Sequence, residues 1–197
     1  MTTYQPKLLK RTQFGNPILH KLAKPVSPAV IGSSEIKQLV ADIKFTMESQ
    51  RYGVGLAAPQ IGVSKALSVI LIRPTPARPD REHFESVIIN PNYTGIGKKE
   101  PMWEGCLSFA SKNSPVFAQA MRFTQIKVSY LDEMGKAHNK ILKDLPAHVF
   151  QHETDHLNGI LFPERVEDHK SWMNTSEYRK RVVKKAKTSP KLSDTID

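Results

Sequence analysis

The stretch DLPAHVFQHETDHLNG, residues 144–159, constrains the fold of this chain more than any other. Residues three and four apart share one face of a helix, so His152, Glu153 and His156 lie together on the stripe that should be buried. Two imidazoles and a carboxylate are costly to bury without partners. A divalent metal removes that cost, because neutral imidazoles can bind it and the adjacent carboxylate can take a proton from water. The alternative is a surface helix with incidental histidines, since HExxH also occurs by chance.

The same stretch carries signals for both ends of a helix. Asp144 is expected to cap the N-terminus, Pro146 fits the first turn, and Gly159 supplies the stop. The helix should therefore present its two histidines well inside its length.

A metal site needs a third protein ligand, and the residues alone leave its identity open. One zinc-peptidase pattern, HExxHxxGxxH, ends in a histidine, but this chain has Phe162 there. Glu177 fits a second peptidase pattern, in which a glutamate follows further downstream. Cys106, in the upstream segment WEGCLS, is the remaining candidate.

Length and composition indicate one compact globular domain with a tail. The chain has 197 residues, of which 39% are hydrophobic and 24% charged, and its net charge is +10. No apolar run is long enough for a membrane span, and the first residues do not read as a secretory signal. Cys106 is the single cysteine, so no disulfide can form within the chain. We expect a cytoplasmic protein of bacterial type; an organelle stays open, although no clear transit peptide is present.

The order of predicted elements is typical of an α+β fold. The helical spacing of apolar residues predicts a helix over 33–50, and Ser33 or Ser34 can cap it. Apolar runs predict strands at 66–72, at 86–90, where Pro91 should close the strand, and at 125–131, with 136–142 as a hairpin partner. A basic helix is expected from about 171–175 to 187. We therefore divide the chain into a catalytic domain, 1–170, and a basic C-terminal helix with a flexible tail, 171–197.

Three segments, in this order, resemble the motifs of the peptide deformylase family. They are GVGLAAPQ at 53–60, EGCLS at 104–108 and QHETDHLNG at 151–159. The resemblance implies antiparallel sheets packed around a central metal-binding HExxH helix. It also implies a hydrolase that removes the formyl group from the N-terminal formyl-methionine of newly made polypeptides and releases formate.

The resemblance implies the metal ligands and the base. Cys106, His152 and His156 would hold one divalent metal, usually Fe(II) in this family, with zinc, nickel or cobalt able to replace it. A thiolate ligand suits Fe(II), although these ligand types do not exclude zinc. Glu153 would act as general base and then as general acid.

Further residues are assigned to the substrate. The resemblance implies that the Gln60 amide and the backbone N–H of Leu107 stabilise the oxyanion, and that Gly55 lets the backbone approach the substrate. By position we assign a methionine pocket, each member of which could equally be plain core: Val54, Met102, Leu145 and Val149.

Residues beside the motifs receive secondary roles. Glu104 and Arg122 are expected to form a structural pair, with an exposed, solvated pair as the alternative. We expect His148 to be exposed, and Asp155 to orient a histidine or to cap. The segment 109–121 departs from the family pattern, which leaves the preference beyond methionine open.

The basic stretch YRKRVVKKAK, residues 178–187, suggests a contact with ribosomal RNA, with a solvated helix as the alternative. The expected partners are nascent formyl-methionyl polypeptides and, through this helix, the ribosome; no membrane or DNA partner is expected.

Two other functions stay open. One is a zinc peptidase that uses Glu177, and the other is a catalytically silent relative that binds ribosomes or RNA.

Overall fold

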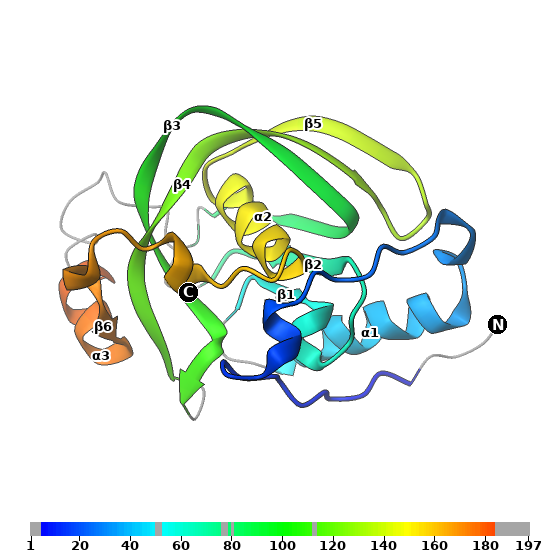
Figure 1. The fold of residues 1–197 in the computed structure, drawn as a ribbon, viewed down its shortest axis with the longest axis horizontal. Coiled ribbons are helices and arrows are strands. Elements are labelled where there is room, and N and C mark those ends of the chain that lie inside the picture. Colours follow the sequence, from blue (N-terminus) through cyan, green and yellow to red (C-terminus); the bar gives the residue numbers. More distant parts are fainter. Residues whose placement is uncertain (1–4, 50–52, 76–78, 80, 112–113, 184–197) are drawn as a thin grey trace.

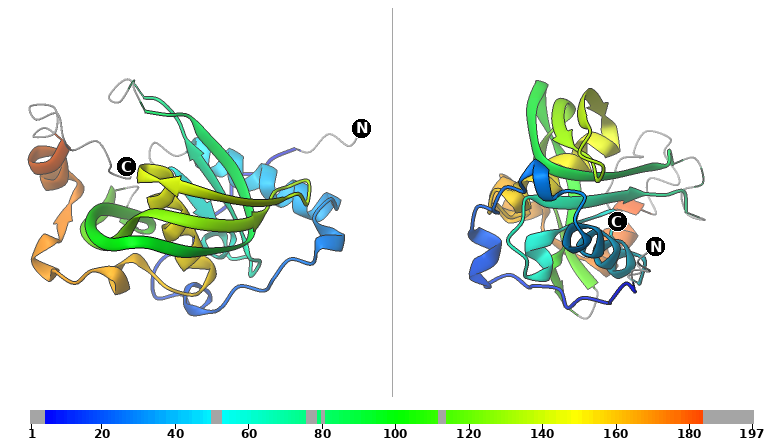
Figure 2. Two further views of the ribbon diagram at one scale, coloured as in Figure 1. Left: turned by 90° about the horizontal axis from the view of Figure 1, so that it is seen from above. Right: turned by 90° about the vertical axis from the view of Figure 1, so that its right-hand side faces the viewer.

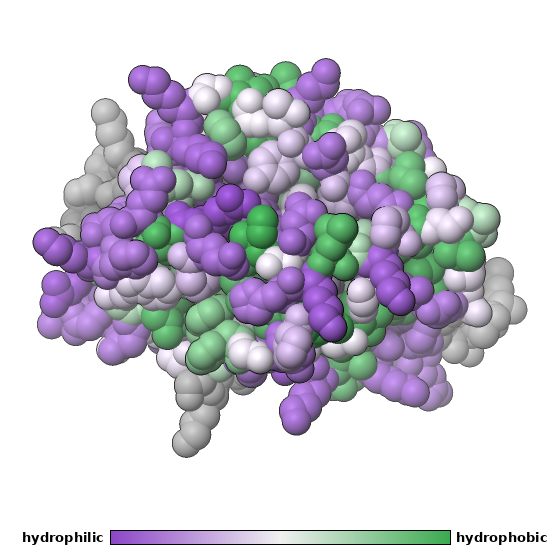
Figure 3. All heavy atoms as spheres, viewed as in Figure 1, coloured by the Kyte–Doolittle hydropathy of each residue, from purple (hydrophilic) through white to green (hydrophobic). Residues whose placement is uncertain are grey.

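The computed structural model describes residues 5–49, 53–75, 79, 81–111 and 114–183. Within these residues the chain is α+β, with six strands in one antiparallel sheet and few helices. None of the helices in this described part is long and apolar enough to cross a membrane. Figure 3 shows one face of the molecule, where hydrophilic side chains surround smaller groups of hydrophobic ones.

Two long strands dominate the sheet. The strand order is β1-β2-β3-β4-β5, with β6 also paired to β4. Figures 1 and 2 show β3 and β4 curving around a central helix, α2. The strands are β1 (Gly55–Ala57), β2 (Leu67–Ile72), β3 (Phe84–Ser111), β4 (Ser114–Leu131), β5 (Ala137–Lys143) and β6 (Met173–Asn174).

The expectation that Pro91 ends a strand is wrong. β3 continues through Pro91, because the proline lies at a register shift between Ile89 and Asn92. At such an irregularity the missing N–H of proline removes no regular ladder hydrogen bond.

The predicted hairpin of 125–131 with 136–142 is confirmed by the pairing of β4 with β5.

The first helix, α1 (Ser34–Ser49), packs against one face of the sheet as its periodicity predicts. The Ser33 hydroxyl accepts a hydrogen bond from the Ile36 N–H at 3.3 Å, so Ser33 is the capping residue. β2 is buried on both faces because its side chains alternate. Leu67, Val69 and Leu71 join the cluster with α1, whereas Ile70 and Ile72 join the cluster with α2.

The central helix, α2 (Asp144–Leu157), is enclosed by the sheet, and every residue from Ala147 to Leu157 is buried. Its start differs from the expectation, because Lys143 takes the capping position and no side chain caps the helix. Its end is as predicted: Gly159 has a φ of +72°, and a Cβ there would lie 2.7 Å from the His20 carbonyl carbon. A glycine is therefore required both for the backbone conformation and for the close approach.

The C-terminal part packs on the sheet. β6 pairs with β4 at Val116 and Phe117. A helical segment follows, α3 (Thr175–Tyr178) and a wider turn, Arg179–Val183. Tyr178 is buried and stacks on Phe117, with ring centroids 3.9 Å apart. The predicted continuation of the basic helix to 187 lies outside the described residues, and the division of the chain at 170 stays a prediction.

Candidate metal centre

The structure brings together three side chains that lie far apart in the sequence. Cys106 lies on β3, His152 and His156 lie on α2, and all three are buried. One ligand atom from each falls within 4.8 Å of the others. The His156 Nε2 atom lies 3.3 Å from Cys106 Sγ and 3.2 Å from His152 Nε2. Ligand atoms around one tetrahedral ion are separated by roughly 3.3–3.6 Å, so this spacing fits a single metal.

The orientation of His152 is fixed by Glu104. The Nδ1 atom of His152 lies 2.8 Å from Glu104 Oε1. An ionised carboxylate only accepts hydrogen bonds, so Nδ1 carries a proton, and once Nε2 has lost its own proton its lone pair faces His156 and Cys106. This is the tautomer that a metal ligand requires.

The pKa values of the two histidines differ because of their neighbours. Burial lowers the pKa of His152, but the charges of Glu104 and Cys106 outweigh it and raise that pKa well above its usual value. Burial and the charge on His152 hold the pKa of His156 well below its usual value. In metal-free protein, His152 therefore favours its doubly protonated, positively charged form beside Glu104 and Cys106. A divalent cation can take the place of the proton on Nε2.

Glu104 is the centre of a buried ion network. Arg122 donates from Nε to Glu104 Oε2 at 3.0 Å and from Nη2 to Oε1 at 2.8 Å. Burial raises the pKa of Glu104, but Arg122 and His152 outweigh it and hold that pKa well below its usual value. The predicted pair of Glu104 and Arg122 is confirmed, and the solvated alternative is wrong because neither side chain is exposed.

The network extends away from the metal ligands through Asp155. Arg122 Nη1 also donates to Asp155 Oδ2. Asp155 accepts two further bonds from Arg165, at 3.0 and 2.8 Å. Asp155 therefore pairs with two guanidinium groups rather than orienting a histidine. Sequence reasoning missed Arg165, because no local pattern links it to Asp155.

The expectation that His148 is exposed is wrong. His148 is fully buried, and its Nε2 atom lies 2.7 Å from Glu104 Oε2. It lies one turn before His152 on a helix that is enclosed on all sides, so its face of the helix meets β3 rather than solvent.

We expect Arg122→Leu to lower the free energy of unfolding by about 3–5 kcal/mol, because it leaves the Glu104 and Asp155 carboxylates without their shared buried partner. Urea unfolding of metal-free protein measures this. Arg165→Leu is the matched control and should cost less, since the Arg165 side chain is 29% exposed. Equal losses in the two variants would contradict this account.

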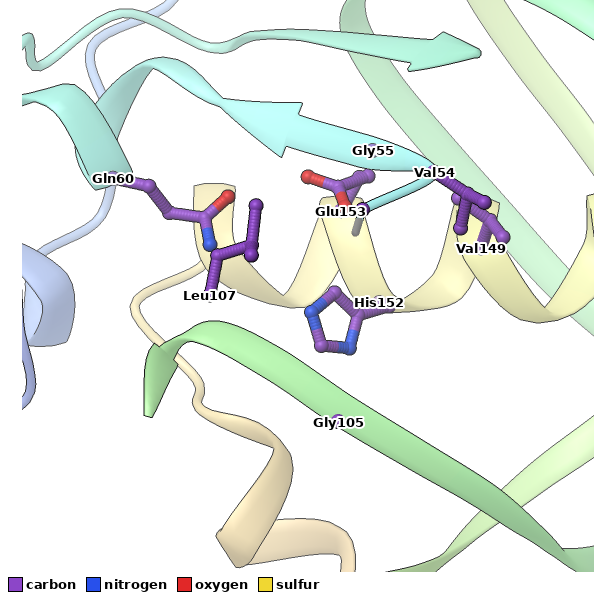
Figure 4. Close-up of a pocket in the computed structure, with 9 residues that line it drawn as sticks. Val54, Gly55, Gln60, Gly105, Leu107, Val149, His152 and Glu153 are labelled. Atoms are coloured by element: carbon purple, nitrogen blue, oxygen red, sulfur yellow. The ribbon is translucent and has the colours of Figure 1, made fainter. Parts of the chain in front are cut away.

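Glu153 faces a small cavity between α2, β1 and β3 (Figure 4). The side chain is buried, and its Oε2 atom has no hydrogen-bond partner among the described residues. Burial raises the pKa of Glu153 to about 7. A Cβ at Gly55 would overlap the Glu153 carboxylate, so the absence of a side chain at Gly55 makes room for this group. The cavity is lined by Gly53, Val54, Gly55, Gln60, Gly105, Leu107, Val149, His152 and Glu153.

Gln60 directs an N–H group into the same space. Its Oε1 atom accepts from the Ala57 N–H at 2.8 Å, which fixes the orientation of the amide. The Nε2 atom then faces Cys106 Sγ at 3.6 Å and Ser108 Oγ at 3.3 Å. Leu107 lines the cavity beside it, and the Leu107 carbonyl is held by Gln13 Nε2 at 3.1 Å. Sequence reasoning missed Gln13, which belongs to none of the three motifs.

Not every residue assigned from the sequence meets at this cavity. Val54 and Val149 line it, whereas Met102 and Leu145 are buried but do not belong to its lining in the described part of the chain. Glu177 pairs with Arg181 at 2.6 Å and is absent from the ligand cluster found among the described residues.

The raised pKa of Glu153 predicts a pH-dependent cost in metal-free protein. The folded-state pKa of about 7 lies above the ordinary value of 4.5, so ionisation of Glu153 weakens the fold as pH rises between these values. Glu153→Gln removes the ionisation. We expect its stability advantage over the parent chain to grow by on the order of 3 kcal/mol from about pH 5 to about pH 8. Urea unfolding at both pH values checks this, and a constant difference would contradict it.

Comparison with known proteins points to the polypeptide deformylase family. The sequence profile described as polypeptide deformylase matches residues 9–172. A "Peptide deformylase 2" from Nostoc sp. is 36% identical over 184 residues, which is 92% of this chain and 99% of the relative. A "Peptide deformylase" from Aquifex aeolicus is 38% identical over 159 residues, 81% of this chain and 89% of the relative.

Solved structures agree with the sequence comparison. A class I type b peptide deformylase from Acinetobacter baumannii, bound to Met-Ala-Ser, superposes with a TM-score of 0.75 at 35% identity, over 82% of this chain and 100% of that chain. A peptide deformylase from Synechococcus elongatus in complex with actinonin has a TM-score of 0.72 at 34% identity, over 92% of this chain and 91% of that chain.

Proposed function

This chain belongs to the polypeptide deformylase family, and from that membership we propose that Cys106, His152 and His156 bind one divalent metal at which the formyl group of N-terminal formyl-methionine is hydrolysed. The chain is a hydrolase of this family, and it acts on newly made polypeptides with release of formate. The observation that carries the proposed site is the convergence of one sulfur and two imidazole nitrogens within 4.8 Å.

The donor set fits a divalent transition metal. One soft thiolate with two imidazoles suits Fe(II), zinc, cobalt or nickel, and Fe(II) is the metal in this proposal. When bound, the metal supplies a water molecule whose pKa is lowered enough to act as a nucleophile near neutral pH. Support comes from Glu104, which holds a proton on His152 Nδ1 and so leaves Nε2 for the metal, and from the low pKa of His156, which keeps its ring neutral with one nitrogen lone pair available.

Glu153 moves the proton in this reaction. Its carboxylate lies in the cavity beside His152, so it can accept a proton from the attacking water and deliver it to the leaving amine. A pKa of about 7 suits both transfers, because the protonated and ionised forms are then both populated near neutral pH. Gly55 leaves the space that this carboxylate occupies.

Gln60 and Leu107 stabilise the negative charge that develops on the formyl oxygen. The Gln60 amide is held by Ala57 and faces the metal ligands, and the Leu107 backbone N–H is the second donor. Preorganised donors of this kind contribute about 3 kcal/mol each to the rate. Both residues line the cavity with Glu153, and Figure 4 shows them on the same side of it.

The methionine side chain is taken up by the apolar wall of the cavity. Val54 and Val149 form this wall, and Leu145 packs in the same hydrophobic cluster. Met102, which was assigned to the pocket by position, does not line the cavity in the described part of the chain, and its role there stays a prediction.

Formate release from a formyl-Met peptide, with protein prepared anaerobically, tests this function. The acetylated peptide is the control, because it presents the same methionine without the formyl group. The proposal predicts stoichiometric formate from the formylated peptide alone. Absence of formate release by metal-loaded protein would contradict it.

The proposed setting is the bacterial cytoplasm, at the ribosome. The relatives named above come from bacteria. Contact with ribosomal RNA through 178–187 is supported by the exposed Arg179, Lys180 and Arg181. A chain in which Arg179, Lys180 and Arg181 are all replaced by Gln keeps the buried Tyr178 in place and loses these three exposed charges. It should co-sediment less with ribosomes across a salt series, and unchanged co-sedimentation would contradict the contact.

A further inference from the structure

Glu104 accepts four hydrogen bonds, and one of the donors has no role in the proposed chemistry. A carboxylate has about four lone-pair sites, two on each oxygen. Arg122 fills one site on each oxygen, and His152 Nδ1 fills the second site on Oε1 at 2.8 Å. His148 Nε2 fills the second site on Oε2 at 2.7 Å. The four sites of this fully buried carboxylate are therefore saturated.

The proton on His148 can be placed from its contacts. Because Glu104 only accepts, the Nε2 atom of His148 carries the proton. Its Nδ1 atom is buried without a hydrogen-bond partner among the described residues. Burial lowers the pKa of His148, which agrees with a neutral ring that donates one hydrogen bond. His148 lies outside the cluster of candidate ligands in the described chain, and its one N–H donates to Glu104.

His148 and His152 are one helical turn apart and reach the same carboxylate. Glu104 on β3 therefore bridges two consecutive turns of α2, one at His148 and one at the ligand His152. Arg122 contacts both oxygens of the carboxylate, but one bidentate partner still lets the group rock and tilt about that contact. The bond from His148 holds Oε2, and this leaves Oε1 aimed at His152 Nδ1.

We infer that His148 is a positioning residue for the metal centre, which holds Glu104 so that His152 presents its Nε2 atom to the metal. This inference rests on the proposed metal site and adds a residue to it. Groups that hydrogen-bond to a ligand change metal affinity by about 10- to 100-fold. His148 acts one contact further out, so the expected effect is at the low end of that range.

The test measures zinc affinity by chelator competition. It compares the metal-free, full-length parent chain with its His148→Leu and His148→Gln variants. The Gln side-chain nitrogen reaches the position of His Nε2, so His148→Gln keeps the bond to Glu104, whereas His148→Leu removes it. We expect about 10-fold weaker zinc binding in His148→Leu and affinity within a factor of about 2 of the parent chain in His148→Gln.

Gln151→Leu is the matched control. Gln151 is also buried on α2, but it bonds the backbone of Phe123 and not Glu104. It should lower stability without weakening zinc binding, whereas a purely structural His148 would behave as Gln151 does. Equal zinc affinity in His148→Leu and Gln151→Leu would overturn the inference.

Two further outcomes, a variant that does not fold and a parent chain that binds no zinc, also bear on the inference. If His148→Leu does not fold, His148→Asn takes its place, since the shorter amide does not reach Glu104. Equal zinc affinity in His148→Asn and His148→Gln would then overturn the inference. Weaker zinc binding in His148→Asn would support it. If the parent chain itself binds no zinc, the proposed metal site fails and the inference fails with it. Zinc binding by the parent chain with no effect at His148 overturns the inference alone.

Discussion

Cys106→Ala should lose its metal and, with it, the release of formate. The substitution removes the one sulfur of the ligand cluster and leaves two imidazoles on a single helix. Each ligand of a three-residue site contributes about 3–4 kcal/mol to binding, so affinity should fall by roughly 100- to 1,000-fold. Metal content after dialysis and formate release from a formyl-Met peptide measure both effects.

Two controls separate this result from a loss of folding or a different ligand set. Cys106→Ala replaces the buried thiol by a hydrogen atom, a small deletion, so the metal-free variant should unfold within about 1–2 kcal/mol of the metal-free parent chain. Glu177→Ala should keep full metal content, because Glu177 pairs with Arg181 instead. Retention of metal by Cys106→Ala, together with its loss from Glu177→Ala, would contradict the ligand assignment and favour a peptidase-like site.

Glu153→Gln should keep the metal and lose catalysis. Glutamine has nearly the same shape but cannot accept a proton, and Glu153 is not one of the three candidate ligands. General acid–base catalysis contributes about 100- to 10,000-fold, and we expect kcat to fall by that amount. The measurement is formate release at equal metal content, with the metal content itself as control. A kcat within about 10-fold of the parent chain would show that another group moves the proton.

The candidate ligands could be found from the sequence because each lies within a short local pattern. The HExxH spacing places His152 and His156 on one helical face whatever the surroundings, and the segment around Cys106 resembles a family motif. The structure brings the three together. The helices α1 and α2 and the β4–β5 hairpin were predictable for the same reason, since their signals are periodicity and turn residues.

Properties set by contacts between distant segments could not be predicted in this way. His148 was expected to be exposed, because the pattern of a single helix does not reveal that β3 covers that face. The passage of β3 through Pro91 depends on a register shift against β4, which is a property of the pair of strands. The partners Arg165 and Gln13 lie outside every motif, and only the folded chain shows that they hold Asp155 and Leu107.

The most direct test of the central claim is X-ray absorption at the edge of the metal bound to the anaerobically prepared protein. We predict one sulfur neighbour at about 2.3 Å from the metal and two imidazole nitrogens at about 2.0–2.1 Å. Any metal that Cys106→Ala retains should show no sulfur neighbour. A spectrum of the parent chain with only nitrogen and oxygen neighbours would contradict the assignment of Cys106, His152 and His156 as the metal site.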